Sequence, residues 1–402
     1  MAASTLPHSQ ATQPRFALFS YGFRPFFWAA GAYALVAIAA WLWIYTTGAL
    51  PLASLPPQAW HGHEMLYGFV AAAIAGFLLT AVPSWTGARG FAGVPLMILA
   101  AIWLAGRLAF AAASILPVPL VLVCELAFFP ALAVLIAPPL VRARNRNTPL
   151  LLVLTGIWLT DVIYLYAFLR GDAVLARSVL VVAIDIVLVL VTVIGGRIVP
   201  AFTASALRTR GLTPDLRSNR WVDGLAIGAM AGIVLVDIIA PSSRAAGVIA
   251  GLAVIAQVMR FTGWRTLRSL FEPLVWCLHL AYVWLPIGLA MKAVFLLTGA
   301  GWAAHWMHAF TIGVAASMVL AVMTRAALGH TGRALAASRP ITAAYVLLSL
   351  AAAVRVFAPS VPSLAYQWTV LAAGALWIGA FAIFLIKYTP ILMRPRIDGR
   401  PG

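Results

Sequence analysis

The sequence predicts an all-α membrane protein with twelve transmembrane helices. Its mean hydropathy is +1.00, and 63% of its 402 residues are hydrophobic while only 9% are charged. Soluble proteins have about a quarter of their residues charged. The apolar stretches are also long enough to cross a bilayer, which needs about 20 residues per helix. We therefore expect one polytopic membrane domain over residues 1–402.

Each predicted helix is an apolar stretch bounded by polar residues, glycine or proline. The spans are expected near 25–46, 61–82, 92–112, 117–140, 148–169, 176–198, 221–240, 243–260, 273–298, 304–327, 339–357 and 364–388. The first 20 residues lack an apolar core followed by a small-residue cleavage site, so the first helix is expected to act as the targeting signal. Cys124 and Cys277 both fall inside apolar stretches, which predicts no disulfide and no thiolate metal site.

Positive charge is concentrated in one set of loops. The loops on that side and the C-terminal tail carry Arg15, Arg24, Arg89, Arg142, Arg144, Arg146, Arg208, Arg210, Arg217, Arg220, Arg265, Arg268, Arg333, Arg339, Arg394, Arg396 and Arg400. Only Arg170, Arg177 and Arg244 fall near the opposite loops. The positive-inside rule then predicts that both termini are cytoplasmic. The net charge of +17 reflects this topology, so no nucleic-acid partner is expected.

Similar segments recur and suggest three four-helix blocks, near 20–140, 148–260 and 272–390. The recurring segments are Leu79-Thr80-Ala81-Val82-Pro83, Gly195-Gly196-Arg197-Ile198-Val199-Pro200 and Val322-Met323-Thr324-Arg325. Proline, glycine and arginine are common at helix ends, so chance likeness is the alternative. A true repeat would group the second helices of the three blocks around one centre, an arrangement that resembles subunit I of the haem-copper oxidases.

Two histidine pairs open the second and tenth predicted helices at the non-cytoplasmic side. His61 and His63, followed by Glu64, stand two residues apart and point away from each other along a helix. His305 and His308 are three apart and share one face. Imidazole suits haem iron and copper, and Glu64 could orient a histidine, bind a metal or relay protons. The alternative is that these histidines only contact lipid headgroups in an aromatic belt.

Two further histidines lie toward the cytoplasmic side. His279 is about six residues into the ninth helix and His330 follows the tenth. They are too deep to join the outer pairs, but they could form a second, inner metal centre with Arg325. His330 could equally be a solvated loop residue.

Several charged residues fall inside the predicted membrane spans, where each needs a partner or a wet cavity. Arg107, Lys292 and Arg355 lie near the outer side and would suit the propionates of a haem, because arginine pairs with carboxylates through two hydrogen bonds. The alternative is structural pairing with Asp237 or Glu125. Asp161 and Asp185 are expected near mid-membrane.

The chain closely resembles the NnrS family of bacterial membrane proteins over nearly its whole length. The segments that carry the resemblance are Phe19-Ser20-Tyr21-Gly22-Phe23-Arg24-Pro25-Phe26-Phe27, Trp60-His61-Gly62-His63-Glu64-Met65, Gly76-Phe77-Leu78-Leu79-Thr80-Ala81-Val82-Pro83, Gly195-Gly196-Arg197-Ile198-Val199-Pro200-Ala201-Phe202-Thr203, Trp276-Cys277-Leu278-His279-Leu280 and Met323-Thr324-Arg325-Ala326-Ala327-Leu328-Gly329-His330-Thr331-Gly332-Arg333. Several such segments in the same order are far more specific than one short motif.

The resemblance implies twelve transmembrane helices in a bacterial inner membrane, bound haem and copper, and a role in relieving nitric oxide stress. It does not assign ligands. One departure lies in the fifth helix, where the family is associated with an asparagine and a histidine and this chain has Asp161 and Tyr164. If that histidine binds metal, this chain lacks one ligand.

Two other functions remain open from the sequence. One is a redox enzyme that resembles the haem-copper oxidases, such as a quinol-dependent nitric oxide reductase. The sixth helix has no histidine, which argues against a standard oxygen-reducing centre. The other is a transporter, for which internal repeats and intramembrane charges are equally expected.

Overall fold

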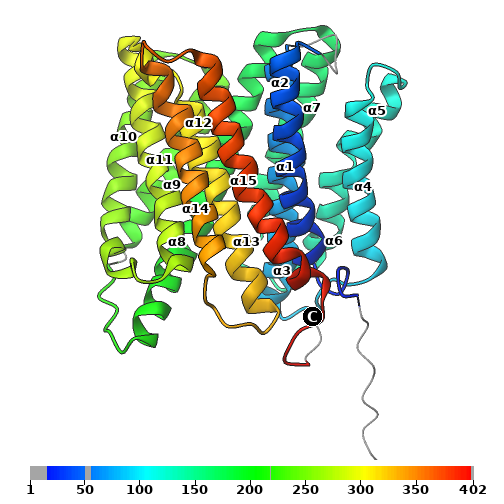
Figure 1. Ribbon diagram of the computed structural model, residues 1–402, viewed down its shortest axis with the longest axis vertical. Helices are drawn as coiled ribbons and strands as arrows, with labels where there is room; N and C mark the ends of the chain where they lie inside the picture. The colour runs from blue at the N-terminus through cyan, green and yellow to red at the C-terminus, as the bar shows by residue number, and fades with distance from the viewer. Residues whose placement is uncertain (1–15, 50–55, 218, 400–402) are drawn as a thin grey trace, which may run out of the picture.

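The computed structural model describes residues 16–49, 56–217 and 219–399. Within them, twelve helical spans are long and apolar enough to cross a membrane, which confirms the predicted number. They run roughly parallel in one bundle (Figure 1). The two described chain ends meet at one end of it, where the amide of Ala17 donates to the carbonyl of Met393 at 2.8 Å. We call the opposite end, where helix α2 lies, the outer end.

The spans follow one another with short connections. Their bounds are α1 Phe23–Thr47, α2 Pro57–His63 continued by η1 Glu64–Val70 and α3 Ala71–Thr86, α4 Val94–Ala111, α5 Val118–Leu126 with α6 Phe128–Arg142, α7 Leu150–Arg170, α8 Ala173–Thr209, α9 Arg220–Ile239, α10 Arg244–Thr262, α11 Pro273–Thr298, then η3 Gly301–Ala303, α12 Trp306–His308, η4 Ala309–Ala316 and α13 Ser317–His330, and last α14 Arg339–Phe357 and α15 Tyr366–Met393. Short 3₁₀ turns lie at η2 Thr266–Ser269 and η5 Ala358–Ser360.

The second and tenth spans, which carry the outer histidine pairs, share a feature that the sequence does not predict. In each, the backbone passes into a π-helix directly after the histidines, over Glu64–Val70 in the second span and Ala309–Ala316 in the tenth. Within the described chain these are the two π-helical segments. Because π turns are rare and occur frequently at functional sites, their presence makes the outer ends of these two spans candidates for a functional site.

The helix of the fourth span is interrupted near its middle, and a carbonyl freed by the interruption binds a neighbouring helix. Pro130 has no amide hydrogen, so the carbonyl of Leu126, four residues earlier, receives no helical hydrogen bond. The indole of Trp158 on α7 donates to this carbonyl at 3.0 Å. The interruption between α5 and α6 thus joins the fourth span to the fifth.

Helix α8 is longer than predicted, since it runs to Thr209 rather than ending near residue 198. The added turns contain Thr203 and Arg208, whose polarity lowers the local hydropathy without opposing a helix. Thr203 instead bonds the carbonyl of Val199 at 2.8 Å. Hydropathy therefore finds the membrane-crossing part of a helix and misses its extension.

The third helix of each proposed block brings a charge to a polar residue of the second. Arg107 on α4 bonds Glu64 at 2.9 Å, and Arg355 on α14 lies 3.4 Å from His305. In the middle block, Asp237 on α9 pairs with Lys292, which also lies 3.6 Å from Asp185 on α8. This likeness fits three blocks, and the repeat itself stays a prediction.

The Gly195-Gly196 pair on α8 has a structural reason at its second position. A Cβ on Gly196 would fall 1.9 Å from Nη2 of Arg260. That side chain crosses α8 at this point, with Nη1 donating to the carbonyl of Thr192 at 2.6 Å and Nε to Asp223 at 2.6 Å. We expect Gly196→Ala to destabilise the protein by about 1–3 kcal/mol through overpacking, measured by thermal unfolding in detergent.

Gly224→Ala on α9 is the matched control, because an added Cβ there meets nothing within 4 Å. It should leave stability unchanged or raise it slightly, since alanine is favoured over glycine inside a helix. Equal losses in the two variants would contradict the overpacking explanation.

Candidate metal centre

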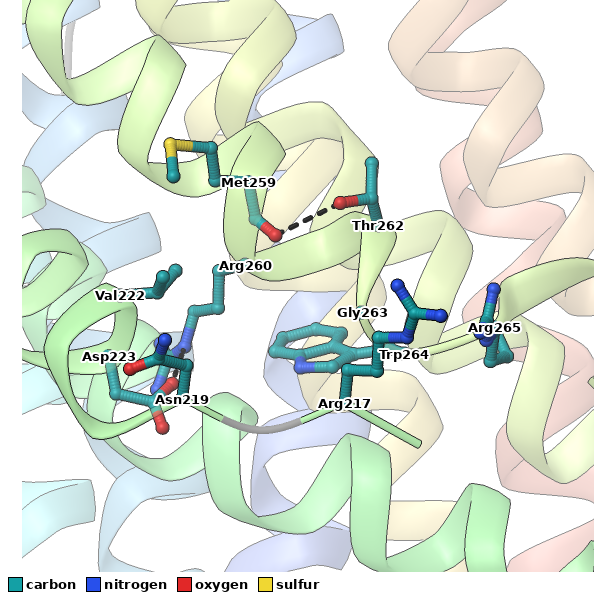
Figure 2. Close-up of a pocket in the computed structure, with 10 residues that line it drawn as sticks. All are labelled: Arg217, Asn219, Val222, Asp223, Met259, Arg260, Thr262, Gly263, Trp264 and Arg265. Carbon is teal, nitrogen blue, oxygen red and sulfur yellow. Dashed lines mark hydrogen bonds and ion pairs between the residues drawn. The ribbon is translucent and has the colours of Figure 1, made fainter. Parts of the chain in front are cut away.

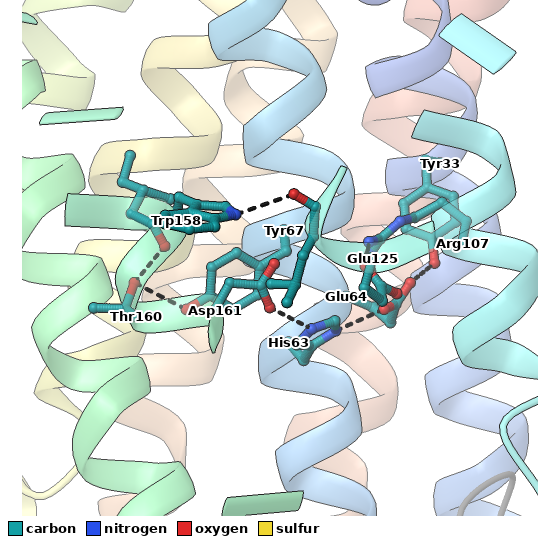
Figure 3. Close-up of polar contacts among 11 residues, drawn as sticks. Tyr33, His63, Glu64, Tyr67, Arg107, Glu125, Trp158, Thr160 and Asp161 are labelled. Atoms are coloured by element: carbon teal, nitrogen blue, oxygen red, sulfur yellow. Dashed lines mark hydrogen bonds and ion pairs between the residues drawn. The ribbon is translucent and has the colours of Figure 1, made fainter. Parts of the chain in front are cut away.

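His63 lies at the end of α2 in a fully buried polar cluster (Figure 3). Its Nδ1 is 2.8 Å from Oε1 of Glu64, and its Nε2 is 3.2 Å from Oδ1 of Asp161 on α7. Ionised carboxylates only accept hydrogen bonds, so both ring nitrogens carry a proton here unless one carboxyl is protonated or a metal ion replaces a proton.

One guanidinium and one hydroxyl group hold the carboxylates of Glu64 and Glu125 in place. Arg107 on α4 donates to Glu64 at 2.9 Å and pairs with Glu125 on α5. The hydroxyl of Tyr33 on α1 donates to the other oxygen of Glu64. A Cβ on Gly68, in the π-helix, would lie 2.3 Å from the ring of Tyr33, so glycine there permits this approach.

Three of these groups are close enough to share one ion. A nitrogen of His63 and carboxylate oxygens of Glu125 and Asp161 lie within 4.8 Å of one another, and all three residues are buried. Oε1 of Glu125 and the hydroxyl of Tyr164 are buried with no hydrogen-bond partner among the described residues. Unpartnered buried polar atoms are rare in folded proteins, and an ion is one explanation for them.

The formal charges of the cluster favour a bound cation. Its three carboxylates, on Glu64, Glu125 and Asp161, face one guanidinium, on Arg107. With a doubly protonated imidazole this leaves one negative charge, and with a neutral, metal-bound imidazole two, in a buried place where uncompensated charge is very costly. A divalent cation would bring the formal charge to zero.

The surroundings of His63 suit a small ion better than a haem. Its ring is enclosed by those of Tyr67, Phe110 and Tyr164, with centroids 4.8, 4.1 and 4.6 Å away. A haem needs open space over an axial nitrogen, and here the nitrogens face carboxylates. One imidazole with carboxylate oxygens suits iron(II), manganese or zinc better than copper(I), which prefers sulfur ligands.

His61 points the other way and belongs to a second set, the outer histidine group of His61, His305 and His308. His61 stacks on Trp41, with ring centroids 4.6 Å apart, and its Nδ1 is buried without a described hydrogen-bond partner. The rings of His305 and His308 are 6.4 Å apart. His308 lies within electrostatic range of both other histidines. By donor type, three imidazoles without carboxylates suit copper or haem iron, although among the described residues their nitrogens do not all lie within 4.8 Å of one another, as the donor atoms of the His63 cluster do.

The three cations expected near haem propionates have different surroundings. Arg107 and Lys292 are buried and paired with the protein's own carboxylates, as the alternative interpretation expected. Arg355 has no carboxylate partner in the described chain: it contacts His305 and donates to the hydroxyl of Tyr366 at 2.5 Å. Of the three, Arg355 is the one whose charge remains available to an anionic group beside the outer histidine group.

The structure does not bring the inner histidines together. His279 is buried and placed between two threonine hydroxyls, that of Thr203 at 2.8 Å and that of Thr266 at 3.0 Å. His330 lies against the ring of Tyr21, 6.1 Å away. No hydrogen bond, ion pair or ring contact among the described residues joins the two histidines or links either to Arg325. The arrangement gives no support to an inner centre.

A cavity of about 320 Å³ lies at the end of the bundle opposite the outer end. It is lined by Arg217 and by residues of the segments 219–223 and 259–265 (Figure 2). Arg260 on its wall is bound to Asp223, and Arg265 is bound to Asp215 at 2.8 Å. With these charges compensated inside the protein, we do not assign the cavity a ligand.

Sequence reasoning placed Glu64 and His63 in a site but left Glu125 and Asp161 without a role in it. The signal was present, because each is an ionisable residue within a membrane span. The departure from the family pattern in the fifth helix also falls here: Asp161 and Tyr164 both face His63. At the place where the resemblance implied that a histidine ligand is missing, the structure has the carboxylate of Asp161 and the phenol of Tyr164.

The fold and the site together define a multi-pass membrane protein with a buried histidine–carboxylate cluster and a separate histidine group near one end of the bundle. The chain belongs to the NnrS family, since the model of the family described as NnrS protein matches residues 17–396. This confirms the family expected from the motifs, and membership fits a role in the nitric oxide response. Comparison with individually curated proteins gives no match.

Proposed function

We propose that this protein binds metal at two places near the outer end of the bundle and protects the cell against nitric oxide. The His63 cluster would hold a small divalent ion. The outer histidine group would hold the haem or copper that the family resemblance implies. The observation that carries the proposal is the excess of buried carboxylate charge around His63, which a divalent ion compensates.

The roles of the chain's own residues differ between the two places. At the first, His63, Glu125 and Asp161 would supply ligand atoms, while Glu64 orients the imidazole through Nδ1, a common support for a metal-bound histidine. At the second, His61, His305 and His308 would supply nitrogens and Arg355 would neutralise an anionic group. Haem or copper there would supply the affinity for nitric oxide.

The topology belongs to the same proposal. We infer a bacterial inner membrane with both termini in the cytoplasm, which puts both metal sites in the outer half of the membrane. Nitric oxide is small and apolar enough to reach them from the bilayer, and a substrate entry pore is not needed.

Purified protein tests the cofactors. We expect absorption typical of haem, copper by elemental analysis, and loss or a shift of the haem spectrum in His305→Ala and His308→Ala. His279→Ala is the control, because its threonine contacts place it outside both sites, and its spectrum should match the wild type. Protein with neither haem nor copper would refute this part of the proposal.

Cells test the role. A strain without the protein should grow more slowly than the wild type under nitric oxide, and the wild-type gene should restore growth while the His305→Ala gene does not. Equal restoration by both would contradict a role for the outer histidine group. Consumption of nitric oxide by purified protein with a quinol donor would identify a reductase rather than a binding protein.

A further inference from the structure

A third buried charged group lies apart from both proposed metal sites. It consists of Asp185 on α8, Asp237 on α9 and Lys292 on α11, which we call the Asp185 triad. All three side chains are at most 3% exposed. Each lies within a membrane-spanning helix, where ionisable residues are costly and commonly carry function.

The charges in the triad do not balance. Lys292 pairs with Asp237, and its Nζ is 3.6 Å from Oδ2 of Asp185. The charged groups that face Asp185 are this lysine and Asp237. Two carboxylates and one ammonium leave one net negative charge. Burying this charge without a counter-charge would destabilise the folded protein more than taking up a compensating positive charge.

The distances to Lys292 indicate which of the two carboxylates lacks a close ion-pair partner. Asp237 has the close contact with Lys292, whereas Asp185 lies beyond hydrogen-bond distance of it. Both oxygens of Asp185 are buried and lack a hydrogen-bond partner in the described part of the chain. An ionised carboxylate in such a place would have no solvent and no close hydrogen bond to stabilise it, only the ammonium of Lys292 at 3.6 Å, which is already paired with Asp237.

A metal ion is a poor solution to this imbalance. The space beside the two carboxylates already holds the ammonium of Lys292, which would repel a second cation. The lysine is itself fixed against the ring of Trp306, 4.9 Å from the ring centroid. A proton on Asp185 needs no added ligand and removes the excess charge.

We propose that the Asp185 triad is a buried proton-binding site in which Asp185 carries one proton while Asp237 and Lys292 remain an ion pair. Trp306 opens α12, the turn that ends at His308. The site therefore lies directly behind the segment that carries the outer histidine group. A proton held there can leave or return when the charge beyond Trp306 changes. The inference does not depend on the identity of the metals.

Infrared difference spectroscopy on the full chain in lipid nanodiscs tests the proposal. A protonated carboxyl has a C=O stretching band that shifts in D2O and that a carboxylate lacks. The number of protons held should equal carboxylates minus ammonium groups. Asp185→Asn and Asp237→Asn should each lose one such band relative to wild type, and Lys292→Met should gain one. Asp172→Asn, which alters an exposed carboxylate that caps α8, should change nothing.

The outcomes that would overturn the proposal are separate for each part of it. A wild-type band intensity retained in Asp185→Asn or, should that variant not fold, in Asp237→Asn, excludes a proton held by the triad. Loss of the wild-type band on adding sodium would identify a cation site instead. Thermal unfolding tests the assignment to Asp185: Asp185→Asn should melt like wild type, because a neutral amide replaces a neutral acid, and Asp237→Asn should melt lower. The reverse order would place the proton on Asp237.

Discussion

Replacement of Arg107 by methionine is expected to destabilise the folded protein by about 3–5 kcal/mol, the cost of breaking a buried ion pair from one side. Arg107 is the one guanidinium bound to both Glu64 and Glu125. Methionine is unbranched and replaces most of the aliphatic stem of arginine, so the loss reflects mainly uncompensated charge. Thermal unfolding in detergent and the yield of monodisperse protein measure it.

Neutralising the carboxylates at the same time should reverse much of this loss. In the triple variant Arg107→Met, Glu64→Gln, Glu125→Gln the one carboxylate left in the cluster, on Asp161, keeps its contact with His63, and we expect this variant to melt above the single variant. Arg107→Lys should fall between the single variant and wild type, because lysine keeps the charge and lacks the planar fork that reaches two carboxylates. A single variant as stable as wild type would show that the cluster is compensated in another way.

Removal of a proposed ligand at His63 is expected to abolish binding of the divalent ion. His63→Ala and Asp161→Asn each delete one member of the group whose donor atoms lie within 4.8 Å. Glu64→Gln should weaken binding by about 10- to 100-fold, as is typical when the partner that orients a metal-bound histidine is changed. Elemental analysis of purified protein and titration of metal-free protein with manganese(II), iron(II) or zinc(II) measure these effects.

Two controls separate binding from folding in that experiment. Asp215→Asn changes an exposed carboxylate paired with Arg265 and should leave the ion content unchanged. His61→Ala removes a histidine on the same turn that faces Trp41 instead, so the ion at His63 should remain while the haem or copper signal falls. Equal ion loss in His61→Ala and His63→Ala would argue against two separate sites.

The spans could be predicted from sequence because hydropathy is a local property of each stretch. The opposite directions of His61 and His63 were likewise predicted, since residues two apart in a helix point to different sides. The composition of the site was not. Asp161 and Glu125 are 98 and 62 residues from His63 along the chain, counted as 161 − 63 and 125 − 63, and only helix packing places them beside it.

Pairings among intramembrane charges show the same limit. Sequence named Arg107 and Lys292 as partners for a haem or for neighbouring acids, and the structure selects the acids. The length and polarity of the spans cannot distinguish haem propionates from neighbouring acidic side chains as partners, because both are anionic and lie at a similar depth. The π-helical turns left no sequence signal either, since their residues are as apolar as those of the α-helices around them.

Those π-helical turns mark where two spans can lose a residue without turning their outer ends. A π-helix closes its hydrogen bonds over five residues rather than four, so Glu64–Val70 accommodates a residue that an α-helix would not. Deleting one residue there would return the segment to α-helix and remove the bulge, whereas deleting one from the α-helical remainder would turn the outer end by about 100°, given 3.6 residues per turn. A substitution in this segment alters one contact. A deletion in the α-helical remainder would give His61 and His63 new neighbours together, so loss of a single residue should be better tolerated in the π-helical segment than in the rest of the same span.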